Sequence, residues 1–231
     1  MPTQERVKTG VPGLDEITGG GLIPKNLVLL TGTAGTGKTT TCCQFVYEGA
    51  TKYKENGVYV TFEEPVESIK SSCSNYGMDF AKLEEEGKVA FVKYDPFHIE
   101  DIYELIETSI KKIDAKRVVI DSISALGLYV KETPEIRRMI FNIAFLLRRL
   151  NCTAILISEI LPMQESLSRF GVEEFVTDGV IVLYYTRKGP SFSRAITVWK
   201  MRGSHHSSKM HPYSITNKGV VIKPDEEAIV S

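Results

Sequence analysis

The chain has 231 residues, of which 42% are hydrophobic and 25% are charged, and its formal net charge is −1. This composition is ordinary for a soluble globular protein, and the length allows a substantial buried core. A net charge so close to zero gives no reason to expect a nucleic acid or an anionic membrane as partner. A local basic patch is still compatible with that net charge.

Short apolar runs alternate with stretches of helical spacing through the first two thirds of the chain. In chain order we predict a strand at 27–31, a helix at 38–53, a strand at 58–61, a helix at 66–76, a strand at 89–92, a helix at 99–113, a strand at 118–120, a helix at 135–150 and a strand at 154–157. Strands that alternate with helices indicate βαβ units around a mostly parallel sheet. The continuous apolar runs favour strands that are covered on both faces.

The pattern changes after Glu159. Residues 161–178 form a long segment of mixed polarity, which is followed by apolar runs at 180–185 and 195–199 and by two shorter runs near Tyr213 and Val220. Only turns separate these runs, so we predict antiparallel hairpins at the C-terminal end. The fold class is therefore α/β, with a mainly parallel central sheet, flanking helices and antiparallel C-terminal strands.

A phosphate-binding loop follows the first strand. Residues 32–39 read G-T-A-G-T-G-K-T and fit the pattern G-x-x-x-x-G-K-[ST] without a mismatch. The glycines let backbone N–H groups curl around phosphate oxygens, and the next helix points its positive end at the same anion. Lys38 would reach the β- and γ-phosphates, and the Thr39 hydroxyl would bind Mg²⁺. The residues predicted to hold ATP in this segment are Gly32, Thr33, Ala34, Gly35, Thr36, Gly37, Lys38, Thr39 and Thr40.

Two further places carry carboxylates at strand ends. Asp121 ends the apolar run 118–120, which is the Walker B pattern, and it is the second predicted magnesium ligand beside Thr39. Glu63 and Glu64 follow the run 58–61. We expect the end of that strand to lie beside the end of the P-loop strand, where either glutamate could polarise the attacking water. The spacing alone is equally compatible with glutamates that begin a helix before Pro65.

Cysteine and histidine give no sign of a metal site. Cys42, Cys43, Cys73 and Cys152 contain no C-x-x-C pair, so we interpret them as reduced, mostly buried thiols. The three histidines at 205, 206 and 211 lack the second half of a metal-binding pattern.

No segment has the ~20 apolar residues of a membrane span, and residues 1–8 do not resemble a signal peptide, so we expect one domain, residues 1–231, in the cytoplasm.

Several motifs together resemble the KaiC-type ATPases of the RecA superfamily. They are the P-loop and the segments T-G-V-P-G-L-D at 9–15, G-G-G-L at 19–22, T-F-E-E at 61–64, V-I-D-S at 119–122, G-V-E-E-F-V at 171–176 and K-M-R-G-S at 200–204. They occur in the family's order, and the similarity extends from about residue 7 to residue 223. The resemblance implies a RecA-type P-loop NTPase fold.

The same resemblance implies a function. KaiC-like domains form hexameric rings that hold ATP between neighbouring subunits, and Glu63 and Glu64 match the catalytic glutamate pair. A C-terminal segment matches the part that reaches the nucleotide of the next subunit, so Lys200 and Arg202 would neutralise γ-phosphate charge in trans. The residues of this segment implied to contact nucleotide are Lys200, Met201, Arg202, Ser204 and His206. On a strand, residues 200 and 202 would share a face.

The chain also departs from the clock proteins. It carries one such domain instead of two, and Glu174 and Phe175 stand where the autokinase half has a Ser-Thr pair, so phosphorylation there is excluded. We expect a slow Mg²⁺-dependent ATPase in a homo-oligomeric ring, with a possible client protein. Two alternatives stay open: a nucleotide-gated scaffold with little turnover, and a DNA-acting relative. Arg169 is the only basic residue in 161–172, which disfavours DNA binding.

Overall fold

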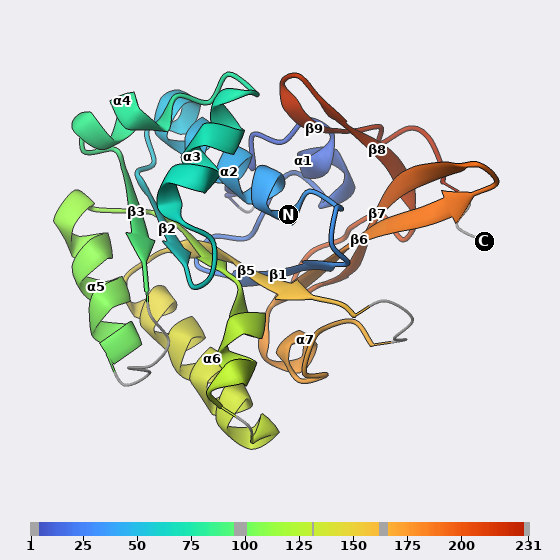
Figure 1. The fold of residues 1–231 in the computed structure, drawn as a ribbon. Helices are drawn as coiled ribbons and strands as arrows, with labels where there is room; N and C mark the ends of the chain where they lie inside the picture. Colours follow the sequence, from blue (N-terminus) through green and yellow to red (C-terminus); the bar gives the residue numbers. More distant parts are fainter. Residues whose placement is uncertain (1–4, 95–100, 131, 162–165, 229–231) are drawn as a thin grey trace.

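The structure, a computed structural model, describes residues 5–94, 101–130, 132–161 and 166–228. Within these residues nine strands form one sheet in the order β3-β2-β4-β5-β1-β6-β7-β8-β9 (Figure 1). The strands are β1 (Leu27–Gly32), β2 (Gly57–Thr61), β3 (Val89–Lys93), β4 (Arg117–Asp121), β5 (Thr153–Glu159), β6 (Gly179–Lys188), β7 (Ser191–Met201), β8 (His211–Thr216) and β9 (Gly219–Ile222). The α-helices are α1 (Leu14–Ile17), α2 (Lys38–Glu48), α3 (Val66–Ser74), α4 (Phe80–Glu85), α5 (Ile102–Ile113), α6 (Thr133–Arg149) and α7 (Glu173–Val176).

The expected mainly parallel sheet with antiparallel C-terminal strands is confirmed. Strands β1 to β6 pair with one another in parallel, and β7, β8 and β9 continue the sheet through antiparallel pairs. Strand β6 differs from the simple hairpin that its sequence suggested, because it also pairs in parallel with β1, with Val28 opposite Gly179. The connection through residues 160–178 is long enough to return the chain to the same end of the sheet, which a parallel pair requires.

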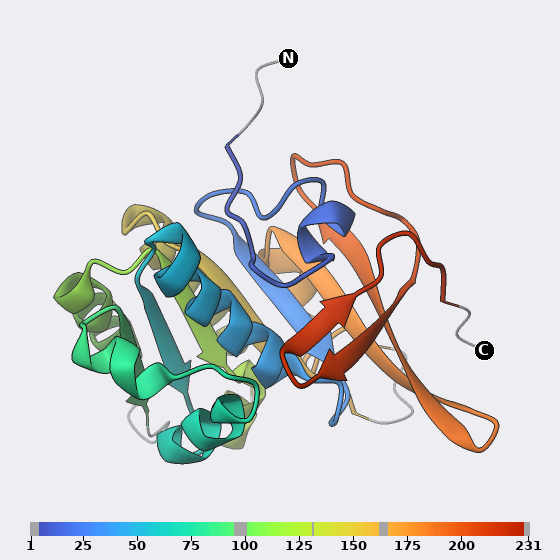
Figure 2. The same ribbon diagram turned by 90° about the horizontal axis from the view of Figure 1, so that it is seen from above.

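Helices cover both faces of the parallel part of the sheet. Helices α2, α3 and α4 lie on one face, together with the β8–β9 hairpin, and α5, α6 and α7 lie on the other (Figures 1 and 2). Alternate residues of β1 enter the two cores, with Val28 and Leu30 facing α2 and with Leu27 and Leu29 facing α6. The apolar runs are continuous because every position of such a strand is buried.

Two local features differ from the expected elements. The helix expected over 38–53 ends as α2 at Glu48, and Gly49–Tyr53 continues it as a π-helix. The close packing of Arg117 explains why glycine stands at this join, since a Cβ atom on Gly49 would lie 2.4 Å from Arg117 Cδ. Helix α4 was not expected; it begins where the Asp79 carboxylate accepts a bond from Lys82 N. The expected start of α5, residues 99 and 100, lies outside the described residues.

Arg117, at the start of β4, is buried completely and joins three parts of the chain. Its guanidinium forms an ion pair with Glu55 at 2.6 Å and donates to the carbonyl oxygens of Phe45 and Lys8, both at 2.7 Å. It also lies over the rings of Phe45 and Tyr53, at 4.6 and 5.2 Å from their centroids. The end of α2, the entry segment and the sheet are therefore held by one side chain.

The four cysteines are free and buried, as interpreted from the sequence. Burial raises the pKa of the Cys42 and Cys43 thiols well above the ordinary value, so both behave as small hydrophobic groups. Of the helices that the structure describes, none has the length and apolar content needed to cross a bilayer.

Candidate functional site

The loop between β1 and α2 has the backbone geometry of a phosphate cradle. Gly35 and Gly37 adopt left-handed conformations with φ of 80° and 86°. A Cβ atom on Gly37 would also lie 2.8 Å from Ile215 Cδ1, so both conformation and space require glycine there. Such a turn lets successive amide groups point to one side, in front of the first turn of α2.

Lys38 lies across this loop. Its ammonium group donates to the carbonyl oxygens of Gly32 and Thr33, each at 2.9 Å. Burial lowers the pKa of Lys38, whereas the charges of Glu159 and Asp121 oppose that shift. An ammonium group has three donors, so one donor is left for a phosphate oxygen.

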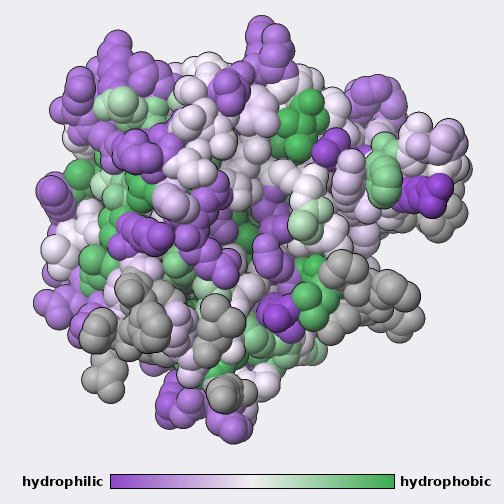
Figure 3. Space-filling view, in the orientation of Figure 1, coloured by the Kyte–Doolittle hydropathy of each residue, from purple (hydrophilic) through white to green (hydrophobic). Residues whose placement is uncertain are grey.

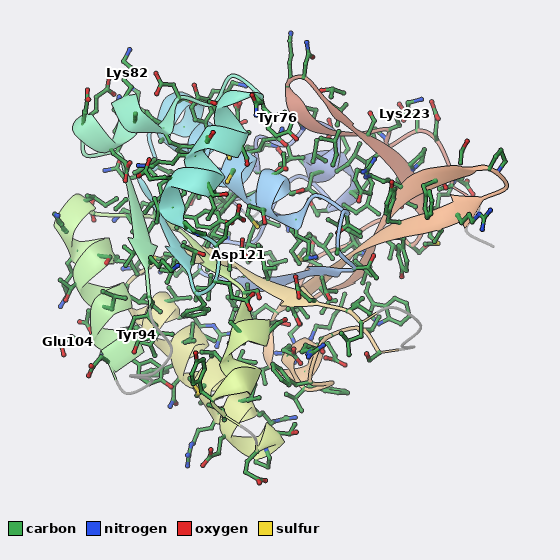
Figure 4. All side chains as sticks on the ribbon, viewed as in Figure 1. Tyr76, Lys82, Tyr94, Glu104, Asp121 and Lys223 are labelled. Atoms are coloured by element: carbon green, nitrogen blue, oxygen red, sulfur yellow. The ribbon has the colours of Figure 1, made fainter. Side chains whose placement is uncertain are left out.

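The two predicted magnesium ligands, Thr39 and Asp121, lie side by side. The Thr39 hydroxyl donates to Asp121 Oδ2 at 3.1 Å, and the Tyr59 hydroxyl donates to the same oxygen at 2.6 Å. Asp121 follows Val119 on the α2 face of β4, and Figure 4 shows it near the middle of the molecule, between the two layers of helices. A hydroxyl and a carboxylate side by side match the oxygen ligands that Mg²⁺ prefers.

Burial raises the pKa of the Asp121 carboxyl, and the hydrogen bonds from Tyr59 and Thr39 oppose the shift. Burial also raises the pKa of the Tyr59 hydroxyl well above its ordinary value, so it stays a neutral donor. A bound Mg²⁺ would supply positive charge to this buried carboxylate in addition to the nearby charge of Lys38. The residues present therefore fit the cofactor.

Two residues of this site were missed in the sequence. Tyr59 is a tyrosine inside an otherwise apolar strand, which is a signal because a buried tyrosine hydroxyl needs a partner. Glu159 ends β5 directly opposite Gly32 of β1, and its charge favours the protonated form of Lys38. The available signal was a carboxylate at the end of an apolar run, since ligands gather at the carboxyl ends of parallel strands.

Glu63 and Glu64 lie farther from the P-loop strand than expected. The expectation that β2 ends beside β1 is wrong, because β4 and β5 lie between them. The segment is nevertheless attached to the site, since Phe62 N donates to the carbonyl oxygen of Asp121 at 2.8 Å. The charge of Glu64 contributes to the raised pKa of Asp121, which places it within electrostatic range.

The two glutamates differ in their surroundings. The Glu64 carboxylate accepts a bond from Ser68 Oγ at 2.9 Å, whereas the Glu63 side chain is exposed. Only the backbone oxygen of Glu63 has a described contact, with Lys93 Nζ at 3.3 Å. The assignment of either residue as the base stays a prediction.

Lys200 and Arg202 lie at the opposite end of the sheet from the P-loop. Met201 pairs with Gly179, the first residue of β6, and β6 runs parallel to β1. The length of β1, six residues, is roughly 20 Å at ~3.3 Å per residue, so these two cations cannot reach the phosphate site of their own chain.

Both cations contact the segment 174–177, although Arg202 lies in the turn after β7 and not on the strand as expected. Lys200 Nζ donates to the carbonyl oxygens of Glu174 and Thr177 at 2.6 and 2.7 Å, and Arg202 Nη2 donates to that of Phe175 at 3.1 Å. Burial lowers the pKa of Lys200, and the nearby Arg202 charge lowers it further. Helix α7 and the turn after it therefore set the direction of both side chains.

The other residues of this segment have mixed environments. Met201 is buried beside Gly179, whereas Ser204 Oγ lies 2.8 Å from the His205 carbonyl oxygen. His206 Nδ1 lies 2.9 Å from the Ser207 carbonyl oxygen. A nucleotide contact by any of the three stays a prediction.

Comparisons with known proteins agree with this geometry. Residues 7–227 match the model of the KaiC ATPase family. The chain belongs to the KaiC ATPase family. It is 39% identical to a UPF0273 protein of Methanocaldococcus jannaschii, over 96% of this chain and 98% of that protein. It is 36% identical to the circadian clock oscillator protein KaiC of a Picosynechococcus species, of which it spans 45%.

A solved structure supports the same family. The KaiC-like protein of Pyrococcus horikoshii OT3 superposes on the chain with a TM-score of 0.88 at 40% identity, covering 96% of this chain and all of that one. The RecA-type fold expected from the motifs is thus confirmed.

The C-terminal strands of this KaiC-family chain support its P-loop. The Tyr213 hydroxyl donates to the Thr36 carbonyl oxygen at 2.6 Å, and the Arg194 guanidinium donates to that of Gly35 at 3.1 Å while lying over the Tyr185 ring. Arg194 fixes the loop in this way because β7 passes beside it. Figure 3 shows hydrophilic and hydrophobic side chains interspersed on the face of the molecule that is seen in Figure 1.

Replacing Tyr213 by phenylalanine is expected to weaken ATP binding. The change removes one hydrogen bond from the loop, which costs about 0.5–1.5 kcal/mol and would raise the dissociation constant up to roughly tenfold. Titration with a fluorescent ATP analogue measures this. Tyr47→Phe, on α2 three turns from the loop, is the matched control, and an equal effect of both changes would refute the role of the Tyr213 hydroxyl.

Proposed function

We propose that this protein binds Mg-ATP and hydrolyses it slowly at the subunit interfaces of a homo-oligomeric ring, which we expect to have six members and a regulatory role. The observation that carries the proposal is the separation of the two halves of the site. The P-loop lies at one end of the sheet, and Lys200 and Arg202 lie at the other. A second copy, placed head to tail, would bring the two halves together, and such contacts close into rings.

The surface around Lys200 and Arg202 supports a protein partner there. A hollow of about 370 Å³ is lined by both cations and by Phe175 and Trp199, whose side chains are 60% and 58% exposed. Exposed aromatic residues next to arginine are typical of the centres of protein interfaces. The facing surface of the neighbour would carry Glu64, whose charge complements the two cations.

The roles of the residues follow from their chemistry. Lys38 and the loop amides would hold the phosphates, and Thr39 and Asp121 would hold Mg²⁺, whose charge would neutralise developing negative charge. Glu63 or Glu64 would accept a proton from the attacking water. Lys200 and Arg202 of the neighbour would contact the γ-phosphate, where a positive charge favours the transition state.

The test is phosphate release per subunit against protein concentration, with saturating Mg-ATP. We expect the specific activity to rise with concentration and then reach a plateau, because dilution separates the halves of the site. Lys38→Ala gives the background rate. A flat profile would contradict a site completed between subunits.

The same assay separates the alternatives. Binding of ATP with assembly but without phosphate release at any concentration would identify a nucleotide-gated scaffold. A turnover rate that increases when single- or double-stranded DNA is added would identify a DNA-acting ATPase. Sedimentation in the presence of ATP reports the number of subunits.

A further inference from the structure

Glu173, the first residue of α7, is a buried carboxylate that the proposed reaction does not use. Its side chain has no exposed surface, yet it accepts bonds from Ser158 Oγ at 2.9 Å and from Ser168 Oγ at 2.7 Å. The backbone N–H groups of Phe170 and Val172 also donate to it, at 3.2 and 3.1 Å. Three of these donors serve Glu173 alone, and the Ser168 hydroxyl is shared with the Glu174 carboxylate. Such a buried carboxylate is held in one orientation, because loss of a bond leaves a buried polar group unpaired.

These bonds fix α7 relative to the sheet. Ser158 belongs to β5, and its side chain points to the same face as Ala154 and Leu156, which is the face that α6 covers. The P-loop helix α2 covers the other face (Figure 1). Glu173 therefore attaches α7 to the face of the sheet opposite α2, at Ser158, which pairs with Thr31 of β1.

Helix α7 in turn orients the two cations at the other end of the sheet. The carbonyl oxygens that receive Lys200 and Arg202 belong to Glu174, Phe175 and Thr177, the residues that follow Glu173 directly. Lys200 has three donors, of which one is used by α7 and one by Thr177, directly after it, so its remaining donor has a fixed direction. A helix of four residues cannot hold this position by its own backbone bonds alone.

We propose that Glu173 is a positioning residue that aims Lys200 and Arg202 at the nucleotide of the neighbouring subunit. It acts through the carbonyl groups of α7 and not by contact with the nucleotide. The inference rests on the proposed function, since it concerns the cations that complete the site in trans. It predicts that Glu173 matters in the subunit that donates the cations, and not in the subunit whose P-loop holds the ATP.

Mixed assemblies test this directional requirement. Lys38→Ala subunits have intact cations, and Arg202→Ala subunits have an intact P-loop. Mixing the two in equal amounts should restore roughly a quarter of the wild-type rate, since a quarter of the head-to-tail contacts combine both intact halves. Failure of this rescue counts against the trans site itself and therefore against the proposed function.

Glu173→Gln is then placed on one or the other subunit. The glutamine side chain has an amide group in place of one carboxylate oxygen, so an N–H donor faces the backbone N–H of Phe170. The Phe170 N–H cannot accept a hydrogen bond, so the contact is lost. With the change on the Lys38→Ala subunit we expect the restored rate to fall roughly 10- to 100-fold, as for a misplacement of about 1 Å. With the change on the Arg202→Ala subunit we expect the restored rate to persist. Equal losses in both arrangements, or none, would overturn the proposal.

A second measurement is independent of catalysis. In the absence of nucleotide, Glu173→Gln should increase hydrogen–deuterium exchange in 168–178 and leave 32–39 unchanged. Ser168→Ala, which removes one donor and keeps the carboxylate, should give a smaller change in the same segment. Glu84→Gln, a structural carboxylate that accepts from Phe91 N, is the matched control. Unchanged exchange in 168–178 would refute the proposal even if the mixing experiment could not restore activity.

Discussion

Replacing Arg202 by alanine is expected to lower the rate of phosphate release by about 10³-fold or more, since a finger of this kind is worth ~10³–10⁵ in rate. The Arg202 side chain is 55% exposed, and its Asp178 contact is long, at 3.8 Å. Its loss should therefore cost little folding free energy. The defect should lie in kcat, with ATP affinity nearly unchanged, because the P-loop of the same chain is intact.

Assembly must be measured in the same experiment, because a missing interface contact would also abolish activity. Sedimentation with ATP shows whether Arg202→Ala subunits still associate. Arg202→Lys retains the charge but not the planar fork, so we expect it to recover only part of the rate. Arg187→Ala, an exposed arginine whose Nε donates to the Gly189 carbonyl oxygen, is the control. Full activity of assembled Arg202→Ala protein would show that the finger assignment is wrong.

Replacing Arg117 by alanine is expected to lower the free energy of unfolding by roughly 3–5 kcal/mol, the usual cost of breaking a buried ion pair on one side. The carbonyl oxygens of Phe45 and Lys8 would lose their donor, and Glu55 would lose its partner. For a chain of this size each kcal/mol corresponds to about 2–4 °C, so the melting temperature should fall by about 10 °C.

The matched control is Arg149→Ala. That arginine also forms an ion pair with a glutamate, Glu107, but its side chain is 57% exposed. An exposed pair contributes about 0–1 kcal/mol, so the melting temperature should hardly change. Thermal unfolding of both variants without nucleotide measures the difference. The Arg149→Ala control is expected to cost at most about 1 kcal/mol. If Arg117→Ala melts within about 2 °C of this control, the buried arginine does not stabilise the fold as described.

The sequence predicted the parallel strands because their signal is local. Each apolar run of β1, β2, β4 and β5 is buried on both faces, and positions buried on either face of a sheet are mostly apolar. The P-loop could likewise be predicted, since every chemical part of it lies within eight consecutive residues.

The order of the strands could not be predicted in the same way. Nothing in residues 57–64 shows that β4 and β5 will lie between β2 and β1, because that order is decided by which helices cross which face. For the same reason Tyr59 and Glu159 escaped notice. Tyr59 reaches Asp121 only because β2 pairs with β4, and Glu159 reaches Lys38 only because β5 pairs with β1.

Helix α7 was missed for a different reason. Its four residues lack the length that helical periodicity needs, and it depends on the bonds of Glu173 to Ser158 and Ser168, which are distant in the chain or separated by a turn. The unusual feature in the sequence was the pair Glu173 and Glu174 at the end of a polar segment, which by itself resembles any solvated helix start.

Strand β7 contacts the P-loop near one end and carries Lys200 near the other. Near its beginning Arg194 holds the Gly35 carbonyl oxygen of the P-loop, and at its end Lys200 leaves the sheet towards α7. The two positions are six residues apart, roughly 20 Å along the strand, and the register of the β6–β7 pair shifts between them, next to Lys200. In a closed ring, each β7 strand would contact the P-loop of its own subunit at one end and the neighbour's ATP site at the other. A small displacement of Gly35 on phosphate release would then move Lys200 relative to the adjacent nucleotide. Successive subunits would therefore hydrolyse ATP in sequence instead of independently.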